Sequence, residues 1–274
     1  MIAKAHGGTV RLVALDLDGT LLDSARRVDE ETARAIRTLP ARGVRAIIAS
    51  ARPPRSVRAI YTSLGLDTWQ VNYNGALIWD EPGRRVVRHL PMEGGAVLEI
   101  IRDARALHPQ TLVSCEIYDR WCTDRFDRAH TTETGKTFRP DVIAPVESFC
   151  TGEITKLLLL GDPAIVDDLM AQLGPRWVGT VTLIRSDPDL IQIMDRRASK
   201  AEALAFVARG CGVPMTDVLA LGDALNDLEM LREAGHSAAV ANAHPDVKAV
   251  ADWVAPSNDA QGVLAALRHW DLAD

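Results

Sequence analysis

The chain has 274 residues, of which 47% are hydrophobic and 25% charged, and its formal net charge at pH 7 is -6. This length predicts one large domain or two smaller ones, each able to bury a core. No run of Lys and Arg indicates a nucleic-acid surface, no apolar run is long enough to span a bilayer, and the N-terminus lacks the apolar core of a signal peptide. We therefore expect neither a nucleic acid nor a membrane as partner.

The four cysteines show no spacing that is typical of a zinc site. They are Cys115, Cys122, Cys150 and Cys211. We expect reduced thiols in a cytoplasmic protein. The sequence leaves the oligomeric state open.

The first stretch of the chain alternates strand-like and helix-like patterns. Apolar runs at 10–15, 43–50 and 69–79 predict buried strands, and the last is interrupted by the turn dipeptide Asn74-Gly75. Helical spacing occupies 28–39 and 51–65 between them. The order strand, helix, strand, helix, strand predicts a parallel sheet with helices on both faces.

The middle of the chain changes character after Pro82-Gly83. Strand-like runs outnumber helices here, and two of them meet at Asp119-Arg120, which predicts a hairpin. Helical patterns occupy 94–107 and 164–174. Such a segment predicts an α+β unit with an antiparallel sheet.

The strand and helix alternation returns from Ile191, with a helix at 199–212, a strand at 217–223 and a helix at 226–235. The sequence thus predicts an α/β domain, residues 1–82 and 191–274, that is split by an inserted α+β domain, residues 83–190.

Polar residues follow four of the predicted strands of the α/β domain. In an open parallel sheet, ligands bind at the carboxyl ends of the strands. Clustered carboxylates repel one another unless a cation holds them together, and oxygen ligands without Cys or His favour Mg²⁺. The residues concerned are Asp16, Asp18, Ser50, Arg52, Asn74, Asp223, Asn226 and Asp227, with Lys200 opening a helix just upstream of the last strand.

Four short motifs at these positions resemble a known family. The segments DLDGTLL, IASARP, SKAEAL and GDALNDLEML resemble, in this order, the four motifs of the haloacid dehalogenase superfamily of phosphotransferases. NYNGALI and the tail ANAHPDVKAVADWVAPSNDAQGV are similar to the Cof-type phosphatase branch. The resemblance implies a Rossmann-like parallel-sheet core with an α+β cap inserted between the second and third motifs. Such a cap implies small-molecule substrates.

The resemblance also implies catalytic and metal-binding roles. Asp16 would be the nucleophile that forms an aspartyl-phosphate, and Asp18 the general acid and then the base for the hydrolytic water. Mg²⁺ would be held by the Asp16 carboxylate, the Asp18 backbone carbonyl and Asp223, with Asp227 as a ligand or close behind the ligands.

The same resemblance implies residues that bind phosphate. Ser50 and Lys200 would hold the phosphoryl oxygens, and Gly19 would let the backbone approach them. Asn226 and Asn74 would orient the site, and Arg52 would contact substrate or cap.

Purely structural roles remain open for some of these residues. Ser50 would then cap the next helix, Asn74 would only form a turn, and Asp227 would only brace a helix. The sequence also departs from the family's usual motifs, since Ala51 and Ala201 stand where glycine is usual. Either methyl group would narrow the phosphate pocket or shift its loop.

The function expected from these residues is Mg²⁺-dependent hydrolysis of small phosphomonoesters. Sugar phosphates are the first expectation, with nucleotides and phosphorylated cofactors behind them. Two alternatives stay open: a phosphomutase or phosphoryl transferase of the same fold, and a catalytically idle protein that binds a phosphorylated metabolite.

Overall fold

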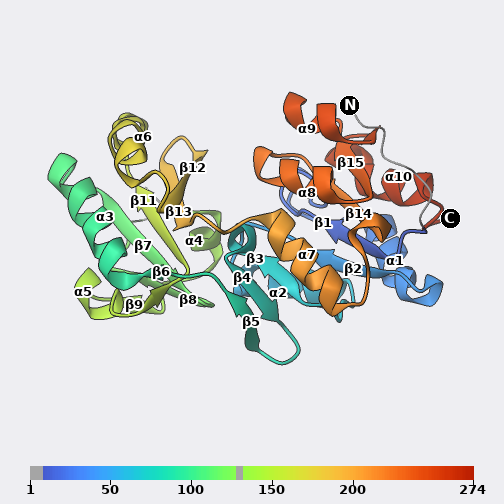
Figure 1. The fold of residues 1–274 in the computed structure, drawn as a ribbon, viewed down its shortest axis with the longest axis horizontal. Coiled ribbons are helices and arrows are strands. Elements are labelled where there is room, and N and C mark those ends of the chain that lie inside the picture. Colours follow the sequence, from blue (N-terminus) through green and yellow to red (C-terminus); the bar gives the residue numbers. More distant parts are fainter. Residues whose placement is uncertain (1–8, 128–131) are drawn as a thin grey trace. The chain divides into compact units, whose positions relative to one another are not determined.

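The computed structural model describes residues 9–127 and 132–274 (Figure 1). The chain forms two compact units: residues up to Val87 together with Ser199–Asp274, and Arg88–Ala198. The sequence placed these borders at 83 and 190. The second border moves because β13 (Leu190–Asp195) pairs with β11 (Lys156–Leu160) and β12 (Val181–Asp187) and so belongs to the inserted unit.

The first unit is built on a five-stranded sheet with the order β16-β15-β14-β1-β2, in which every neighbouring pair is parallel. The parallel α/β class predicted from the sequence is confirmed. The strands are β1 (Leu12–Leu15), β2 (Arg45–Ile48), β14 (Val218–Gly222), β15 (His236–Val240) and β16 (Trp253–Ala255).

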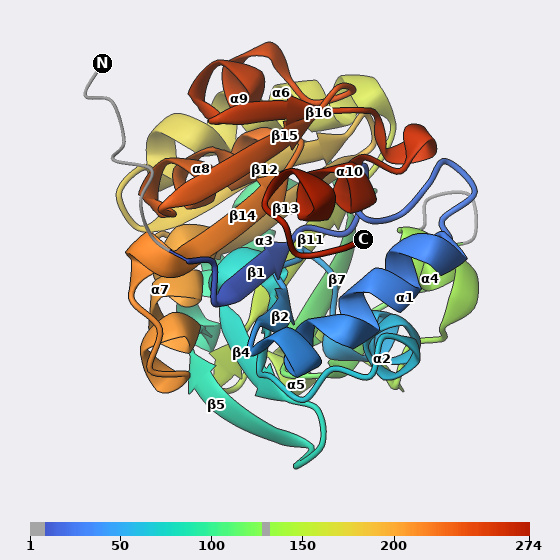
Figure 2. The same cartoon turned by 90° about the vertical axis from the view of Figure 1, so that its right-hand side faces the viewer.

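Alternation along β1 places apolar side chains on both faces of this sheet. Val13 and Leu15 pack into a core with helices α1, α2 and α10, and Leu12 and Ala14 pack into another with α7, α8 and α9. Figure 2 shows α1 and α10 on one side of the strands and α7 and α8 on the other. The helices are α1 (Glu30–Thr38), α2 (Pro54–Ser63), α7 (Lys200–Gly210), α8 (Leu228–Glu233), α9 (Pro245–Val250) and α10 (Gly262–His269).

The third predicted strand region departs from the expected parallel sheet. It forms β3 (Gln70–Asn72) and β4 (Leu77–Asp80), which pair antiparallel and join β5 (Arg85–His89) in a three-stranded sheet. The chain reverses because Asn74 and Gly75 adopt positive φ angles of 54° and 97°. Only an isolated bridge between Ala49 and Val71 continues the parallel arrangement in the described part of the chain.

The second unit contains a six-stranded sheet with the order β12-β13-β11-β7-β8-β9, antiparallel except for the last pair. The hairpin predicted at Asp119-Arg120 joins β7 to β8. Helices α3 and α6 cover one face and share an apolar core with the sheet. The long elements are α3 (Gly94–Leu107), β7 (Leu112–Ile117), β8 (Arg120–Thr123), β9 (Val142–Ile143), β11 (Lys156–Leu160), α6 (Pro163–Trp177), β12 (Val181–Asp187) and β13 (Leu190–Asp195).

Shorter elements complete the second unit. They are β6 (Met92–Glu93), α4 (Glu133–Thr137), α5 (Val146–Phe149) and β10 (Glu153–Ile154), and β6 pairs with β10. Within the described residues, no helix of either unit combines the length and apolar character that crossing a bilayer requires.

Candidate active site

Two neighbouring strands of the first unit bring acidic residues to one edge of the sheet. β1 and β14 run parallel with Leu15 opposite Leu221, and the backbone amide of Asp16 donates to the carbonyl of Leu221 at 3.1 Å. Asp16 and Asp223 both follow the carboxyl ends of these strands. This is the edge at which parallel α/β sheets bind ligands.

Lys200 lies buried beside these acids. Its ammonium nitrogen Nζ donates to Oδ1 of Asp16 and to Oδ1 of Asp227, each at 2.6 Å, and its side chain is 1% exposed. The residue opens α7 behind the cap residue Ser199, whose hydroxyl accepts from the Ala201 amide. A lysine is unfavourable at the positive end of a helix, so the two carboxylates supply the compensation here.

Three carboxylates gather at the same place. Oxygens of Asp16, Asp223 and Asp227 lie within 4.8 Å of one another. The Thr20 hydroxyl donates to Oδ1 of Asp223 at 3.1 Å. Oδ2 of Asp227 accepts the backbone amides of Asp223 and Ala224 at 3.1 and 3.0 Å. Asp227 therefore braces the loop after β14, in addition to any part it has in holding a cation.

The charges of this group are unbalanced without a further cation. Burial, with repulsion from Asp227 second, raises the pKa of Asp16 well above its usual range. The same two causes raise the pKa of Asp223 to about 6. Burial by itself lowers the pKa of Lys200, but Asp16 and Asp227 outweigh it, so the net shift is upward and the ammonium stays charged. Three oxygen-donating acids against one ammonium fit a hard divalent cation such as Mg²⁺.

The turn after Asp18 admits only glycine. Gly19 has a φ of 82°, and a Cβ atom at this position would lie 2.4 Å from Oδ2 of Asp223. The Asn242 side chain fixes the turn by donating to the Gly19 carbonyl at 2.8 Å. Asn242 is not among the site residues predicted from the sequence, and its only signal is its place in the tail that resembles the Cof-type branch.

Asp18 does not join the other carboxylates. Among the described residues, the group close enough to share a cation is Asp16, Asp223 and Asp227. The Asp18 side chain is 56% exposed and pairs with Arg52, whose Nε donates to Oδ2 at 2.7 Å and whose Nη2 donates to Oδ1. The guanidinium thus occupies both oxygens of Asp18.

Ser50, Asn74 and Asn226 form a chain of hydrogen bonds in the same unit. The Asn74 amide donates to the Ser50 carbonyl at 3.1 Å, and Nδ2 of Asn226 donates to Oδ1 of Asn74 at 2.9 Å. The Ser50 hydroxyl accepts the Arg52 amide at 3.1 Å. Ser50 does not cap the next helix, because α2 begins at Pro54 behind Pro53. The turn expected at Asn74 is present, and the same residue also accepts the hydrogen bond from Asn226.

The two alanines at usual glycine positions lie in different surroundings. Ala201 is buried and belongs to the apolar core shared by α7 and the sheet. Ala51 is half-buried in the loop after β2. The Ala201 methyl group thus packs into the hydrophobic core, and it adds apolar contact there.

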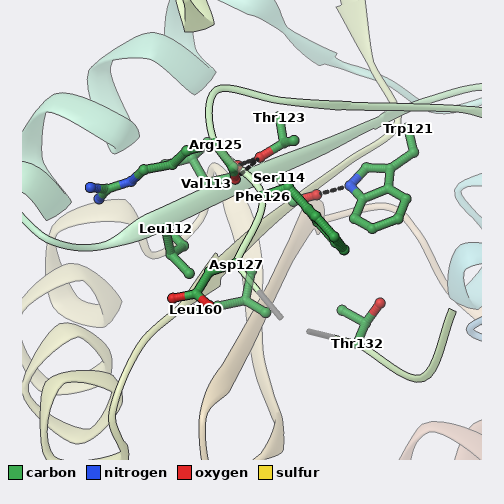
Figure 3. Close-up of a pocket in the computed structure, with 10 residues that line it drawn as sticks. All are labelled: Leu112, Val113, Ser114, Trp121, Thr123, Arg125, Phe126, Asp127, Thr132 and Leu160. Atoms are coloured by element: carbon green, nitrogen blue, oxygen red, sulfur yellow. Dashed lines mark hydrogen bonds between the residues drawn. The ribbon is translucent and has the colours of Figure 1, made fainter. Parts of the chain in front are cut away.

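The second unit has a small pocket of its own (Figure 3). Trp121 donates from its indole nitrogen to the Ser114 hydroxyl and packs edge-on against Phe126, with ring centroids 5.7 Å apart. The pocket has a volume of about 20 Å³. This is room for about one water molecule and not for a metabolite.

Nearly the whole chain is similar in sequence to known proteins. The sequence profile of the haloacid dehalogenase-like hydrolases matches residues 13–267. The 5-amino-6-(5-phospho-D-ribitylamino)uracil phosphatase of Bacillus subtilis is 29% identical over 96% of this chain and 96% of its own. An HMP-PP phosphatase of Serratia proteamaculans is 27% identical over 95% of each chain.

Structural comparison agrees on the fold. A haloacid dehalogenase-like hydrolase from Bacteroides thetaiotaomicron superposes with a TM-score of 0.86 and covers 95% of this chain and 99% of its own, at 23% identity. The two chains therefore share one fold over nearly their whole length.

Proposed function

We propose that this chain, which belongs to the haloacid dehalogenase-like hydrolases and is a phosphatase of that family, uses Mg²⁺ to hydrolyse small phosphomonoesters through an aspartyl-phosphate on Asp16. The observation that carries the proposal is the buried contact of Lys200 with Asp16 and Asp227 beside Asp223. Burial of the charged groups of Asp16, Lys200 and Asp227 next to the half-buried Asp223 is costly, and their geometry suits a nucleophile held for an anionic substrate.

The proposed reaction starts with Asp16. A carboxylate oxygen of Asp16 attacks the phosphorus atom, and the bond from phosphorus to the ester oxygen breaks. Asp18 gives a proton to that oxygen, so the alcohol leaves neutral. Asp18 then takes a proton from a water molecule, which attacks phosphorus and releases inorganic phosphate and free Asp16.

Other residues of the first unit hold the phosphoryl group. Lys200 has three ammonium protons, two of which go to Asp16 and Asp227, and the third suits a phosphoryl oxygen. Ser50 would donate its hydroxyl proton to a second phosphoryl oxygen. The hydrogen bond between Asn74 and Asn226 holds two neighbouring loops together, and Gly19, which has no Cβ, leaves room for the Asp223 carboxylate beside the backbone.

The residues that would hold Mg²⁺ are Asp16, Asp223 and the backbone carbonyl of Asp18, with Asp227 behind them. When bound, the cation neutralises the acids and the phosphate, so that one anion can approach the other. Asp227 has its oxygens committed to Lys200 and to two backbone amides, which suits a supporting position.

Sugar phosphates are the substrate class that we propose first. The name of the Bacillus relative gives a phosphate ester on a ribityl chain as the substrate of that protein. The test is phosphate release from sugar phosphates, nucleotides and phosphorylated cofactors, with Mg²⁺ and with chelator. We expect release only with Mg²⁺ and the fastest turnover for sugar phosphates.

Two results would contradict this proposal. Phosphoryl transfer to an added sugar phosphate that exceeds phosphate release would indicate a phosphomutase or transferase. The absence of metal-dependent release from every compound would indicate a binding protein without turnover.

A further inference from the structure

The pair formed by Asp18 and Arg52 is at odds with the proposed work of Asp18. Both carboxylate oxygens accept from one guanidinium. An arginine side chain keeps its protons at all physiological pH values, so it cannot pass one to Asp18. A carboxylate held in this way can neither protonate a leaving oxygen nor take a proton from water.

The pair is also easy to open. The Asp18 side chain is 56% exposed and that of Arg52 is 20% exposed. Ion pairs that water reaches contribute little to stability, since solvent screens them and long side chains lose freedom. An incoming anion can therefore replace Asp18 on the guanidinium at small cost.

The backbone of Arg52, in contrast, is fixed. Its amide donates to the Ser50 hydroxyl at 3.1 Å. Its carbonyl accepts the Asn72 side-chain amide at 3.1 Å and the Tyr73 amide at 3.4 Å. Arg52 thus has a flexible side chain on an anchored loop, next to the hydroxyl that we assign to phosphate binding.

We propose that Arg52 is an exchange residue that holds Asp18 at rest and moves to the phosphoryl group when substrate binds. The guanidinium fork matches two phosphoryl oxygens as well as it matches a carboxylate. Arrival of the phosphate then frees both oxygens of Asp18, and the exposed carboxyl group takes up a proton from solvent, which it delivers to the leaving oxygen. The inference rests on the proposed function, because it takes Asp18 as the acid and base.

A different arrangement would leave Arg52 on Asp18 throughout the reaction. The two arrangements differ in how Asp18 and Arg52 jointly affect phosphate affinity. In the exchange, Asp18 competes with phosphate for Arg52, so removing the Asp18 charge tightens phosphate binding most when Arg52 is present. In the permanent pair, Arg52 already masks the Asp18 charge, so the same change tightens binding most when Arg52 is absent.

The test is calorimetric titration of inorganic phosphate, in the presence of Mg²⁺, into the wild type, Asp18→Asn, Arg52→Met and the double variant. We expect Asp18→Asn to lower the Kd of phosphate by about fivefold or more in the wild-type background, and by clearly less in the Arg52→Met background. Equal or larger tightening in the Arg52→Met background would overturn the exchange.

Three controls separate an effect on phosphate binding from an effect on folding or charge. Thermal unfolding confirms that each variant is folded, and Arg52→Gln replaces Arg52→Met if the latter fails to fold. Arg52→Lys keeps the charge without the fork, and we expect it to bind phosphate more weakly than the wild type. Phosphate release by the wild type is measured beside the titrations, and if there is none, the proposed function fails together with the inference. If the wild type binds phosphate with the opposite coupling, only the inference fails.

Discussion

The end of the first unit's parallel sheet and the helix-covered core of the second unit differ in the side chains that they bury. The first unit buries Asp16, Lys200 and Asp227 together at the end of a parallel sheet. The core of the second unit, between its sheet and helices α3 and α6, consists of aliphatic side chains, Met92, Phe149 and thiols. Buried charges cost free energy unless they are paired, whereas buried apolar side chains stabilise a fold directly. We therefore expect the buried charges of the first unit to lower its stability and the apolar core of the second unit to raise its stability.

The substitution with the largest expected effect on the buried charges of the first unit is Asp16→Asn. We expect the variant to lose more than about 10³-fold in kcat, because the amide cannot attack phosphorus. Its thermal stability should stay near that of the wild type, because Lys200 keeps Asp227 as a partner at 2.6 Å and the amide removes the repulsion of Asp16 by Asp227 and Asp223. Parallel measurements of phosphate release and thermal unfolding check both parts. Metal-dependent turnover by a folded Asp16→Asn variant would exclude an aspartyl-phosphate at this position.

Lys200→Met tests the cost of the buried charges. It leaves Asp16 and Asp227 without the ammonium that both contact at 2.6 Å. Loss of one partner from a buried ion pair destabilises by about 3–5 kcal/mol. Chemical denaturation with and without Mg²⁺ measures the effect, and we expect Mg²⁺ to restore more stability in Lys200→Met than in the wild type. Unchanged stability would mean that the carboxylates of Asp16 and Asp227 are protonated and that the Lys200 ammonium does not neutralise them.

The sequence predicted this part of the site because its geometry follows from topology. β1 and β14 are neighbours in a parallel sheet, so residues that directly follow them, Asp16 and Asp223, must meet. The resemblance to the haloacid dehalogenase superfamily pointed to the same residues, and the match of the family's sequence profile confirms that resemblance. The roles of the individual site residues remain predictions.

Side-chain contacts between residues that are distant in the sequence could not be predicted from the sequence. Asn242 reaches the Gly19 carbonyl, and Arg52 reaches Asp18, through side-chain rotamers that no local pattern specifies. The reversal at Asn74-Gly75 was signalled as a turn. The sequence did not predict that β3 and β4 would pair outside the parallel sheet, because the pairing partners of a strand depend on the whole fold.

Leu157→Ala addresses the apolar side of the comparison. Leu157 lies on β11, is fully buried and packs in the core of the second unit. A buried leucine cut to alanine costs about 2–5 kcal/mol, because apolar contact is lost and a cavity remains. Hydrogen exchange of the β11 and β7 amides reports the loss in this unit. Leu107→Ala, at an exposed position of α3, is the matched control and should change stability by less than about 0.5 kcal/mol.

The smallest effect that we expect comes from the cap of α1 in the first unit. Asp29 accepts the backbone amides of Glu31 and Thr32 at 3.0 and 3.1 Å, while Glu93, at the same position before α3, makes no such bond. Asp29→Ala should therefore cost about 1 kcal/mol at pH 7, and Glu93→Ala much less. Equal losses in the two variants would show that the capping bonds of Asp29 contribute nothing.

The cap should also respond to pH in a direction that the structure sets. The hydrogen bond from the Thr32 backbone amide is the main cause that lowers the pKa of Asp29, so the folded state favours the ionised carboxylate. That stabilisation is present above the unfolded-state pKa of about 3.9 and disappears as the pH falls through the lower folded-state value. The difference between wild type and Asp29→Asn should accordingly shift against the wild type below about pH 4, because the amide keeps an acceptor oxygen and does not titrate. Denaturation of both proteins across this range measures the shift, and a difference independent of pH would mean that Asp29 caps the helix through its oxygen alone.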